Sequence, residues 1–184
     1  MRGTTRGHWL LGLVCLAVAC GHAIAAGNET AMGEYQVKAA HLFNFTKFTD
    51  WPTSAFTSAT APIVIGIVGE DPFGKTMDEV VRDEVVRERK LTVKRLHADD
   101  DLQSCHVLFI SRSEKDHVQA LVNKLKGHPV LLVGDMNDFA PKGGMVGLVL
   151  SNNTVKFEVN QAAAEKAGLQ ISAKLLKLAR IVNN

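Results

Sequence analysis

The chain contains four short runs of strand length that alternate with segments patterned as helices or turns. The runs are residues 63–68, 90–96, 106–110 and 129–134, with helices expected at 72–82 and 113–125. A run such as "PVLLVG", apolar at nearly every position, is typical of a strand covered on both faces, as in a parallel sheet between layers of helices. Strands that alternate with helices along a chain form βαβ units. This order predicts an α/β fold with a mostly parallel sheet.

The two ends of the domain differ from this repeating middle. Residues 33–52, "GEYQVKAAHLFNFTKFTDWP", predict an opening helix that stops at Trp51-Pro52, because a residue before proline is disfavoured in the α region. Residues 145–159 predict two antiparallel strands joined at Asn152-Asn153, a pair that accepts positive φ. Asn160 is an N-cap candidate for the segment that follows, and Ser172 is expected to cap a closing helix that runs through Ala179. We therefore predict a single three-layer, Rossmann-like domain with a C-terminal antiparallel hairpin and a closing helix.

The N-terminus has the features of a secretory signal peptide. Two arginines precede the apolar run "WLLGLVCLAVA", and "AIA" at 23–25 fits a cleavage site between small residues. We expect residues 1–25 to be removed on export and residues 26–184 to form the domain. The segment "LAVAC" supports a second interpretation, cleavage before Cys20 and lipidation of that cysteine, which would change the location but not the fold.

Removal of the leader changes both the charge and the cysteine content. The full chain has 21 Lys+Arg and 19 Asp+Glu, and the leader contains two arginines and no acid, so the exported chain has 19 of each. A neutral surface with mixed charges predicts no nucleic-acid partner. Cys105 then has no cysteine to pair with. It is either a buried strand cysteine or a thiol that reacts or pairs between molecules.

Residues 68–76, "VGEDPFGKT", match the G-x-x-x-x-G-K-[ST] pattern of nucleotide hydrolases. A loop of that kind binds phosphate by pointing backbone N–H groups at the anion. Here Pro72 has no N–H, and the carboxylates of Glu70 and Asp71 would lie beside the phosphates. We therefore expect a strand-to-helix turn in which Asp71 caps the helix, and no ATP site.

No other motif predicts catalysis. The histidines of the exported chain do not form an H-E-x-x-H pattern, and no pair of cysteines is available for a metal. Ser111 and Ser113 follow the third strand, but neither lies in a G-x-S-x-G turn. Asp135 ends the fourth strand, where a carboxylate is common in many α/β domains. We expect no enzyme activity, no metal and no cofactor.

The chain resembles the YfiR family of periplasmic proteins in five segments. In order they are "YQVKAAHLFNFTKFTDWP", "IVGEDPFG", "CHVLFIS", "VLLVGDMNDFAPKGGMV" and "VKFEVNQAAAEKAGLQISAKLLKLA". Together they cover nearly the whole exported chain. The most specific parts are the helix that ends at Trp51-Pro52, the loop 139–144 and the segment 157–176.

The resemblance implies a non-enzymatic regulator. Proteins of this family repress a membrane-bound diguanylate cyclase by binding its periplasmic part, which controls cyclic di-GMP synthesis and biofilm formation. An outer-membrane lipoprotein with an OmpA-like domain can relieve this repression, and a homodimer is a further candidate assembly. Family members can carry internal disulfides, so the lone Cys105 departs from them. An alternative hypothesis is a periplasmic small-molecule sensor or carrier with a pocket at the carboxyl ends of the strands, serving another membrane partner.

The loop "NDFAPKGG", residues 137–144, is the expected partner-binding segment. Its site residues are Phe139, Pro141, Gly143 and Gly144. An apolar side chain on a glycine-flanked loop either packs into the core or contacts another protein, and for Phe139 both alternatives are open at this stage. The two glycines would let the loop turn sharply into the next strand.

Overall fold

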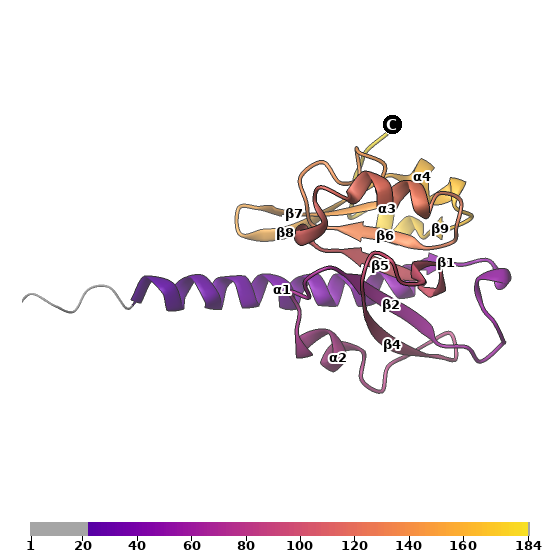
Figure 1. Cartoon of the computed structure of the whole chain (residues 1–184), viewed down its shortest axis with the longest axis horizontal. Coiled ribbons are helices and arrows are strands. Elements are labelled where there is room, and N and C mark those ends of the chain that lie inside the picture. The colour runs from indigo at the N-terminus through magenta and orange to yellow at the C-terminus, as the bar shows by residue number, and fades with distance from the viewer. Residues whose placement is uncertain (1–21, 184) are drawn as a thin grey trace, which may run out of the picture.

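The computed structural model describes residues 22–183 (Figure 1). Cys20 and all but the last four residues of the expected leader lie outside this range. The helices are α1 (His22–Phe48), α2 (Lys75–Val81), α3 (Val118–Lys124), α4 (Gln161–Lys166) and α5 (Ala173–Leu176), with 3-10 turns at Thr53–Ala55, Leu102–Ser104 and Arg112–Glu114. The strands are β1 (Thr49–Asp50), β2 (Ile63–Val68), β3 (Val85–Val86), β4 (Arg89–Leu96), β5 (Val107–Ile110), β6 (Leu131–Gly134), β7 (Val146–Ser151), β8 (Thr154–Val159), β9 (Gln170–Ile171) and β10 (Arg180–Ile181).

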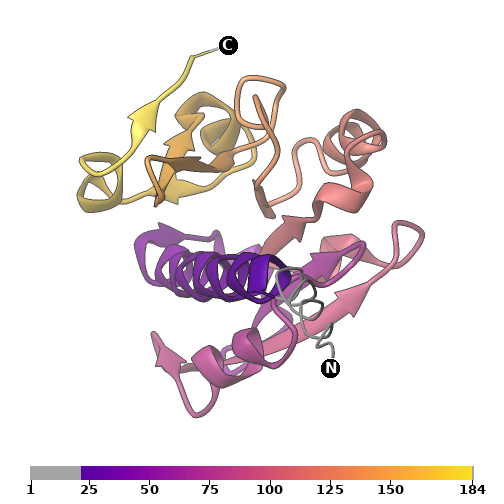
Figure 2. The same ribbon diagram turned by 90° about the vertical axis from the view of Figure 1, so that its left-hand side faces the viewer.

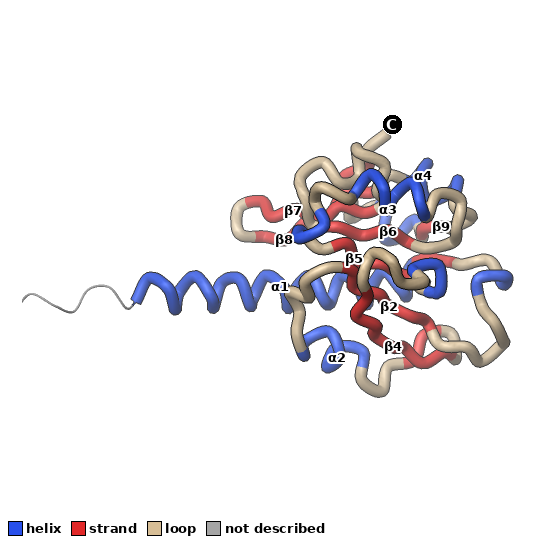
Figure 3. Tube along the Cα trace, in the orientation of Figure 1, coloured by secondary structure: helices blue, strands red, loops and turns tan. Residues whose placement is uncertain are grey.

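Eight strands form one sheet in the order β10-β8-β7-β6-β5-β2-β4-β3. Figure 3 shows the strands in red, with β6, β5, β2 and β4 following one another across the molecule. Five consecutive strands of the sheet run parallel to one another, and they are β7, β6, β5, β2 and β4. The hairpin of β7 and β8 is antiparallel, as is the pair of β3 and β4. The prediction of a mostly parallel α/β sheet with an antiparallel hairpin near the C-terminus is therefore confirmed.

Helices cover both faces of this sheet. Helix α1 packs against α2 and α5 and against strands β5 and β8 (Figure 2). The chain passes from β2 through α2 to β4, toward one edge of the sheet, and from β5 through α3 to β6, toward the other edge. Because such crossovers are right-handed, α2 and α3 lie on opposite faces. Residues of α3 and α4 line a common pocket over β6. This arrangement gives the three layers that the sequence predicts.

Helix α1 is longer than the sequence pattern indicates. It begins at His22 instead of residue 33, and projects from the domain (Figure 1). Its inner face is set by Ala39, Leu42 and Phe45, which are fully buried at intervals of three residues. The helix ends at Phe48, before Trp51-Pro52, because the next two residues pair with β9 as a short antiparallel ladder.

Three other predicted boundaries differ because local hydrogen bonds or strand pairs replace helical turns. The helix expected from 72 begins at Lys75, and the one expected at 113–125 is divided into a 3-10 turn and α3. The closing helix stops at Leu176, because the chain then pairs with β8 as strand β10. Strand β3, joined to β4 by two residues with positive φ, was not predicted.

Several local predictions are confirmed. Asn152 and Asn153 have φ values of 49° and 56° and form the tight turn between β7 and β8. Asn160 caps α4 by accepting a hydrogen bond from the Ala163 N–H at 3.0 Å, and Ser172 caps α5. Cys105 is buried, which raises the pKa of its thiol to about 11, so the buried-cysteine alternative fits this residue.

His106 is a buried titratable group at the amino end of β5, and only 5% of it is exposed. Its Nδ1 accepts a hydrogen bond from the Val64 N–H at 3.1 Å, and its ring stacks on Phe56 at a centroid distance of 4.4 Å. Burial lowers the pKa of His106 from 6.5 to about 4, and the charge of Arg89 adds to this effect. The folded protein therefore holds this histidine neutral through most of the mildly acidic range.

We expect His106 to make stability fall in mild acid. Because its pKa is lower in the folded than in the unfolded chain, the unfolded chain binds the extra proton between pH 6.5 and 4, and about 2 to 3 kcal/mol of stability is lost across that window. Urea unfolding at several pH values measures this loss. The His106→Asn variant keeps an acceptor for Val64 but does not titrate, so its pH dependence should be smaller. Equal slopes for both proteins would contradict the prediction.

Candidate functional site

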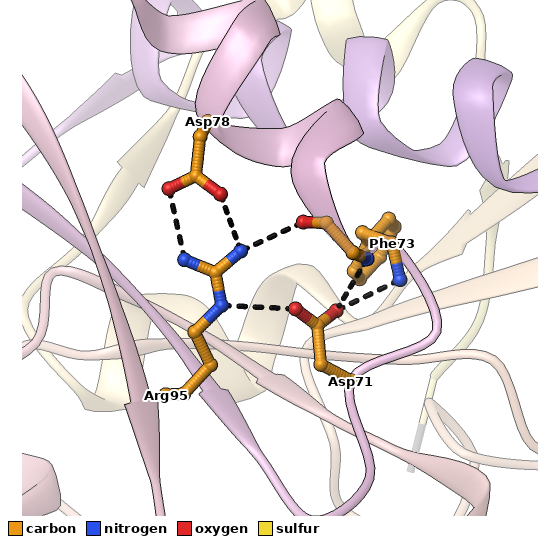
Figure 4. A network of polar contacts seen from close by, with 5 residues as sticks. Asp71, Phe73, Asp78 and Arg95 are labelled. Carbon is orange, nitrogen blue, oxygen red and sulfur yellow. Dashed lines mark hydrogen bonds and ion pairs between the residues drawn. The ribbon is translucent and has the colours of Figure 1, made fainter.

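In the loop that matches the phosphate-binding motif, backbone N–H groups bind a side chain of the loop itself (Figure 4). The Asp71 carboxylate accepts hydrogen bonds from the N–H groups of Phe73 and Gly74 at 2.8 and 3.3 Å. Asp71 thus caps the turn that precedes α2, whose N-cap position is Gly74. The N–H of Glu70 donates to the Ser113 hydroxyl at 2.9 Å. Three N–H groups that a phosphate would need are therefore already used.

Arg95, on β4, fixes the other side of this turn (Figure 4). Its guanidinium contacts Asp78 at 2.8 and 2.5 Å and Asp71 at 2.9 Å, and it donates to the Gly74 carbonyl at 2.7 Å. These hydrogen bonds hold the pKa of Asp78 below its usual range. Lys75, the residue of the motif that would bind phosphate, is exposed. The residues of this segment thus form a turn between β2 and α2 that hydrogen bonds and ion pairs hold in place.

The loop 136–144 connects β6 to β7, and its expected site residues do not all face the same way. Phe139 is 1% exposed, and Gly144 is also buried. Pro141 is exposed and Gly143 is half-buried, with a φ of 101°. The loop is braced by hydrogen bonds from the N–H groups of Gly143 and Gly144 to carbonyls within it. Phe139 is therefore part of the core of the free protein, and the exposed residues of the loop are Asn137, Asp138, Pro141 and Lys142.

Two glycines form the seat of the Phe139 ring. A methyl group at Gly134, the last residue of β6, would lie 2.7 Å from the ring, and one at Gly144 would lie closer still. Real side chains do not make such contacts, so both positions must lack a Cβ for the ring to fit. Gly144 therefore serves close packing, and the sharp turn predicted for both glycines requires only Gly143.

A buried cluster of charged groups lies next to this loop. Lys38 of α1 is fully buried, and its ammonium lies 2.6 Å from Asp135 Oδ2, directly after β6. The same ammonium forms an ion pair with Glu34, one helical turn earlier. The Tyr35 hydroxyl donates a hydrogen bond of 2.9 Å to the same carboxylate oxygen. The helix and the sheet are thus connected through one shared carboxylate.

Arg112 completes the cluster from the solvent side. Its Nε donates to the Asp135 backbone carbonyl at 3.2 Å and lies 3.3 Å from the side-chain oxygen Oδ2. Burial and the neighbouring Asp135 carboxylate raise the pKa of Tyr35 above its usual range, so this hydroxyl stays protonated as a donor. The two cations and two carboxylates balance in charge, while Asp135 Oδ1 is buried without a hydrogen-bond partner.

An open pocket of about 420 Å³ lies beside this cluster, at the carboxyl ends of the parallel strands. Its lining residues are Arg112, Lys115, Val118, Asp135, Met136, Asn137, Phe139 and Lys142. Half of these belong to the loop 136–144. Ligands of α/β folds bind at this edge of the sheet, so the loop, the charged cluster and the pocket together form the candidate functional site.

Sequence reasoning did not find Glu34, Tyr35, Lys38 or Arg112. A signal was present, because Lys38 lies four and seven residues before Leu42 and Phe45 and therefore on the apolar face of α1. A lysine in that position needs a buried partner. The partner, Asp135, is 97 residues away, and the sequence does not identify it.

The described part of the chain shows no metal centre or membrane span. Among residues 22–183, no group of three or more His, Cys, Asp or Glu side chains is placed to hold a metal ion. No described helix is long and apolar enough to cross a membrane.

Two solved structures are similar to this chain at low sequence identity. One is the ABC domain from Streptococcus pneumonia in complex with L-Trp, with a TM-score of 0.47 and 11% identity over 65% of this chain and 55% of that one. The other is a conserved domain protein from Vibrio cholerae O1 biovar eltor, with a TM-score of 0.49 and 12% identity over 66% of this chain and 54% of that one. This chain thus spans little more than half the length of each.

A comparison with protein families gives a specific match. The model of the YfiR/HmsC-like family matches residues 35–180, which include the buried face of α1, the sheet up to the first residue of β10, and the loop 136–144. That family consists of periplasmic regulators of diguanylate cyclase signalling. The match covers well over half of the sequence, and the chain therefore belongs to the YfiR/HmsC-like family.

Proposed function

We propose that this protein is exported to the periplasm, by removal of residues 1–25, and represses a membrane-bound diguanylate cyclase by binding its periplasmic part, without catalysing a reaction itself. The observation that carries the proposal is the family match over residues 35–180. The occupied amides of the loop at Asp71 support the absence of an ATP site. Loss of this protein would raise cyclic di-GMP and promote biofilm formation.

We place the cyclase-binding surface on the exposed part of the loop 136–144. Asn137, Asp138, Pro141 and Lys142 are exposed, and the buried Phe139 ring holds the segment that carries them. Surface loops held by a rigid scaffold commonly carry binding residues. The buried Phe139 would thus fix the position of the loop without contacting the partner. Pro141 and Lys142 would contact the partner, and Gly143 allows the turn of the loop.

Substitution of the exposed loop residues should weaken repression without unfolding the protein. We expect Pro141→Ala combined with Lys142→Glu to reduce affinity for the purified periplasmic domain of the cyclase at least tenfold, because an interface anchor and a rim charge are changed together. Binding is measured by calorimetry, and cyclic di-GMP is measured in a deletion strain that carries each variant.

Lys75→Ala is the matched control, because Lys75 is also exposed but is the first residue of α2, outside the loop 136–144. It should bind and repress as the wild type does. Full repression by the double variant would remove the loop from the interface, and loss of repression in Lys75→Ala would revive a role for the nucleotide-like motif. A deletion strain with unchanged cyclic di-GMP would overturn the proposed function itself.

Two further assemblies belong to this proposal. An outer-membrane lipoprotein with an OmpA-like domain would relieve repression by sequestering the protein, and a homodimer is the other candidate. Cys105 would not link such a dimer, since it is buried. The alternative function, small-molecule sensing or transport for another membrane partner, is favoured by one observation, the pocket beside Arg112.

A further inference from the structure

The pocket beside Arg112 is lined by more positive than negative charge. Its charged residues are Arg112, Lys115, Lys142 and Asp135. The carboxylate of Asp135 is already paired with the buried Lys38 at 2.6 Å. Lys38 also pairs with Glu34, which lies 3.9 Å from Arg112, so the excess of positive charge that the pocket presents to solvent comes from Lys115 and Lys142.

The three cations of the lining make few contacts that would occupy them. The side chain of Lys115 has no hydrogen bond or ion pair with any described residue. Lys142 lies 4.0 Å from Asp138, and both side chains are more than 60% exposed, so this pair is weak. Arg112 directs Nε toward Asp135, and its Nη2 lies 3.9 Å from Glu34, but its side chain is 58% exposed and stays accessible to solvent. Donors therefore remain available for an anion.

The remaining lining of the pocket is largely apolar. Val118 of α3, Met136 and the edge of Phe139 contribute carbon surface, and Asn137 adds an amide at the rim. Cavities of about 300 to 1,000 Å³ that combine apolar walls with a few polar groups are typical sites for small molecules. The volume of about 420 Å³ lies at the smaller end of that range.

We propose that this pocket binds a small organic anion, a carboxylate with a compact apolar body. The carboxylate would lie between Arg112, Lys115 and Lys142, where a guanidinium can bind both of its oxygens. The apolar body would contact Val118 and Met136 and exclude water from them. This inference rests on the alternative function above, for which it names the class of ligand, and it does not depend on repression of the cyclase.

Calorimetry with a fixed panel of probes tests the charge requirement. The exported form of the protein is titrated with hexanoate, benzoate and 3-phenylpropionate, and with the uncharged 3-phenyl-1-propanol. At least one carboxylate should bind, and the alcohol should bind at least tenfold more weakly than 3-phenylpropionate. Added salt should weaken the binding of the carboxylate and not that of the alcohol.

Two matched variants place the binding in this pocket. Lys115→Gln combined with Lys142→Gln should weaken carboxylate binding about tenfold, since two charge contacts are removed together. Both lysines are exposed, so the thermal unfolding midpoint should not change. Lys90→Gln is the control, because Lys90 is exposed at the amino end of β4, far along the sheet from the pocket, and its binding should equal that of the wild type.

Two results would overturn the inference. One is a panel in which no carboxylate binds the wild type. If the double lysine variant then also fails to bind the cyclase, the lysines of the pocket contact a carboxylate of the protein partner instead. The other is carboxylate binding that is as strong in the double variant as in the wild type, which would place the anion elsewhere.

Discussion

Replacing Phe139 by alanine should lower the free energy of unfolding by about 3 to 5 kcal/mol. The ring is 1% exposed and lies against Gly134 and Gly144, so its removal leaves a cavity bounded by two residues that have no side chain to fill it. The backbone cannot collapse easily, because Gly134 is paired within the sheet. Urea unfolding of wild type and variant measures the difference.

Two controls separate packing from partner binding. Lys142→Ala changes an exposed residue of the same loop and should alter stability by less than about 0.5 kcal/mol. Phe139→Leu keeps much of the buried volume and should lose less stability than Phe139→Ala. If Phe139→Ala costs under about 1 kcal/mol yet abolishes binding to the cyclase domain, the ring is an interface anchor and not a core group.

The order of elements was predictable because it depends on patterns within single segments. Apolar runs of strand length, the Asn152-Asn153 turn and the cap at Asn160 each depend on a few neighbouring residues. Some of the elements that were missed depend on distant partners. Strand β9 exists because β1 lies beside it, and β10 exists because β8 offers a free edge. Two-residue strands have no sequence pattern of their own.

The candidate site was only partly predictable, for a similar reason. The sequence identified the loop at Phe139, but the choice between core and interface needed the position of Gly134, five residues earlier and in another element. The charged cluster combines α1 with the end of β6, which are about a hundred residues apart in the chain. A buried lysine can be suspected from its helical face, whereas its carboxylate partner is found only in the folded chain.

Substitution of Lys38 by methionine should be among the most destabilising single changes in this protein, at about 3 to 5 kcal/mol. Methionine fills a similar volume, so the effect isolates the charge. The variant leaves the fully buried side chain of Asp135 without its ammonium partner, and Glu34 keeps only its pair of 3.9 Å with Arg112. Arg112 cannot replace Lys38, because it approaches from the exposed side.

The matched control is Lys47→Met on the same helix. Lys47 is exposed and rests on the Phe43 ring at 3.9 Å, so its loss should cost less than about 1 kcal/mol. Both variants are compared with wild type by urea unfolding at constant pH and salt. An equal effect of the two substitutions would show that Lys38 contributes no more than a surface lysine.

A double variant then distinguishes the loss of an attraction from the presence of an unpaired charge. Asp135→Asn removes the negative charge that Lys38→Met leaves behind, and it keeps the shape of the side chain. Because a buried ion pair often contributes little net stability while a single buried charge costs much, the double variant should be more stable than Lys38→Met alone. If the two substitutions instead add, with the double variant the least stable, the pair itself holds α1 against β6 and the network is a true stabilising link between helix and sheet.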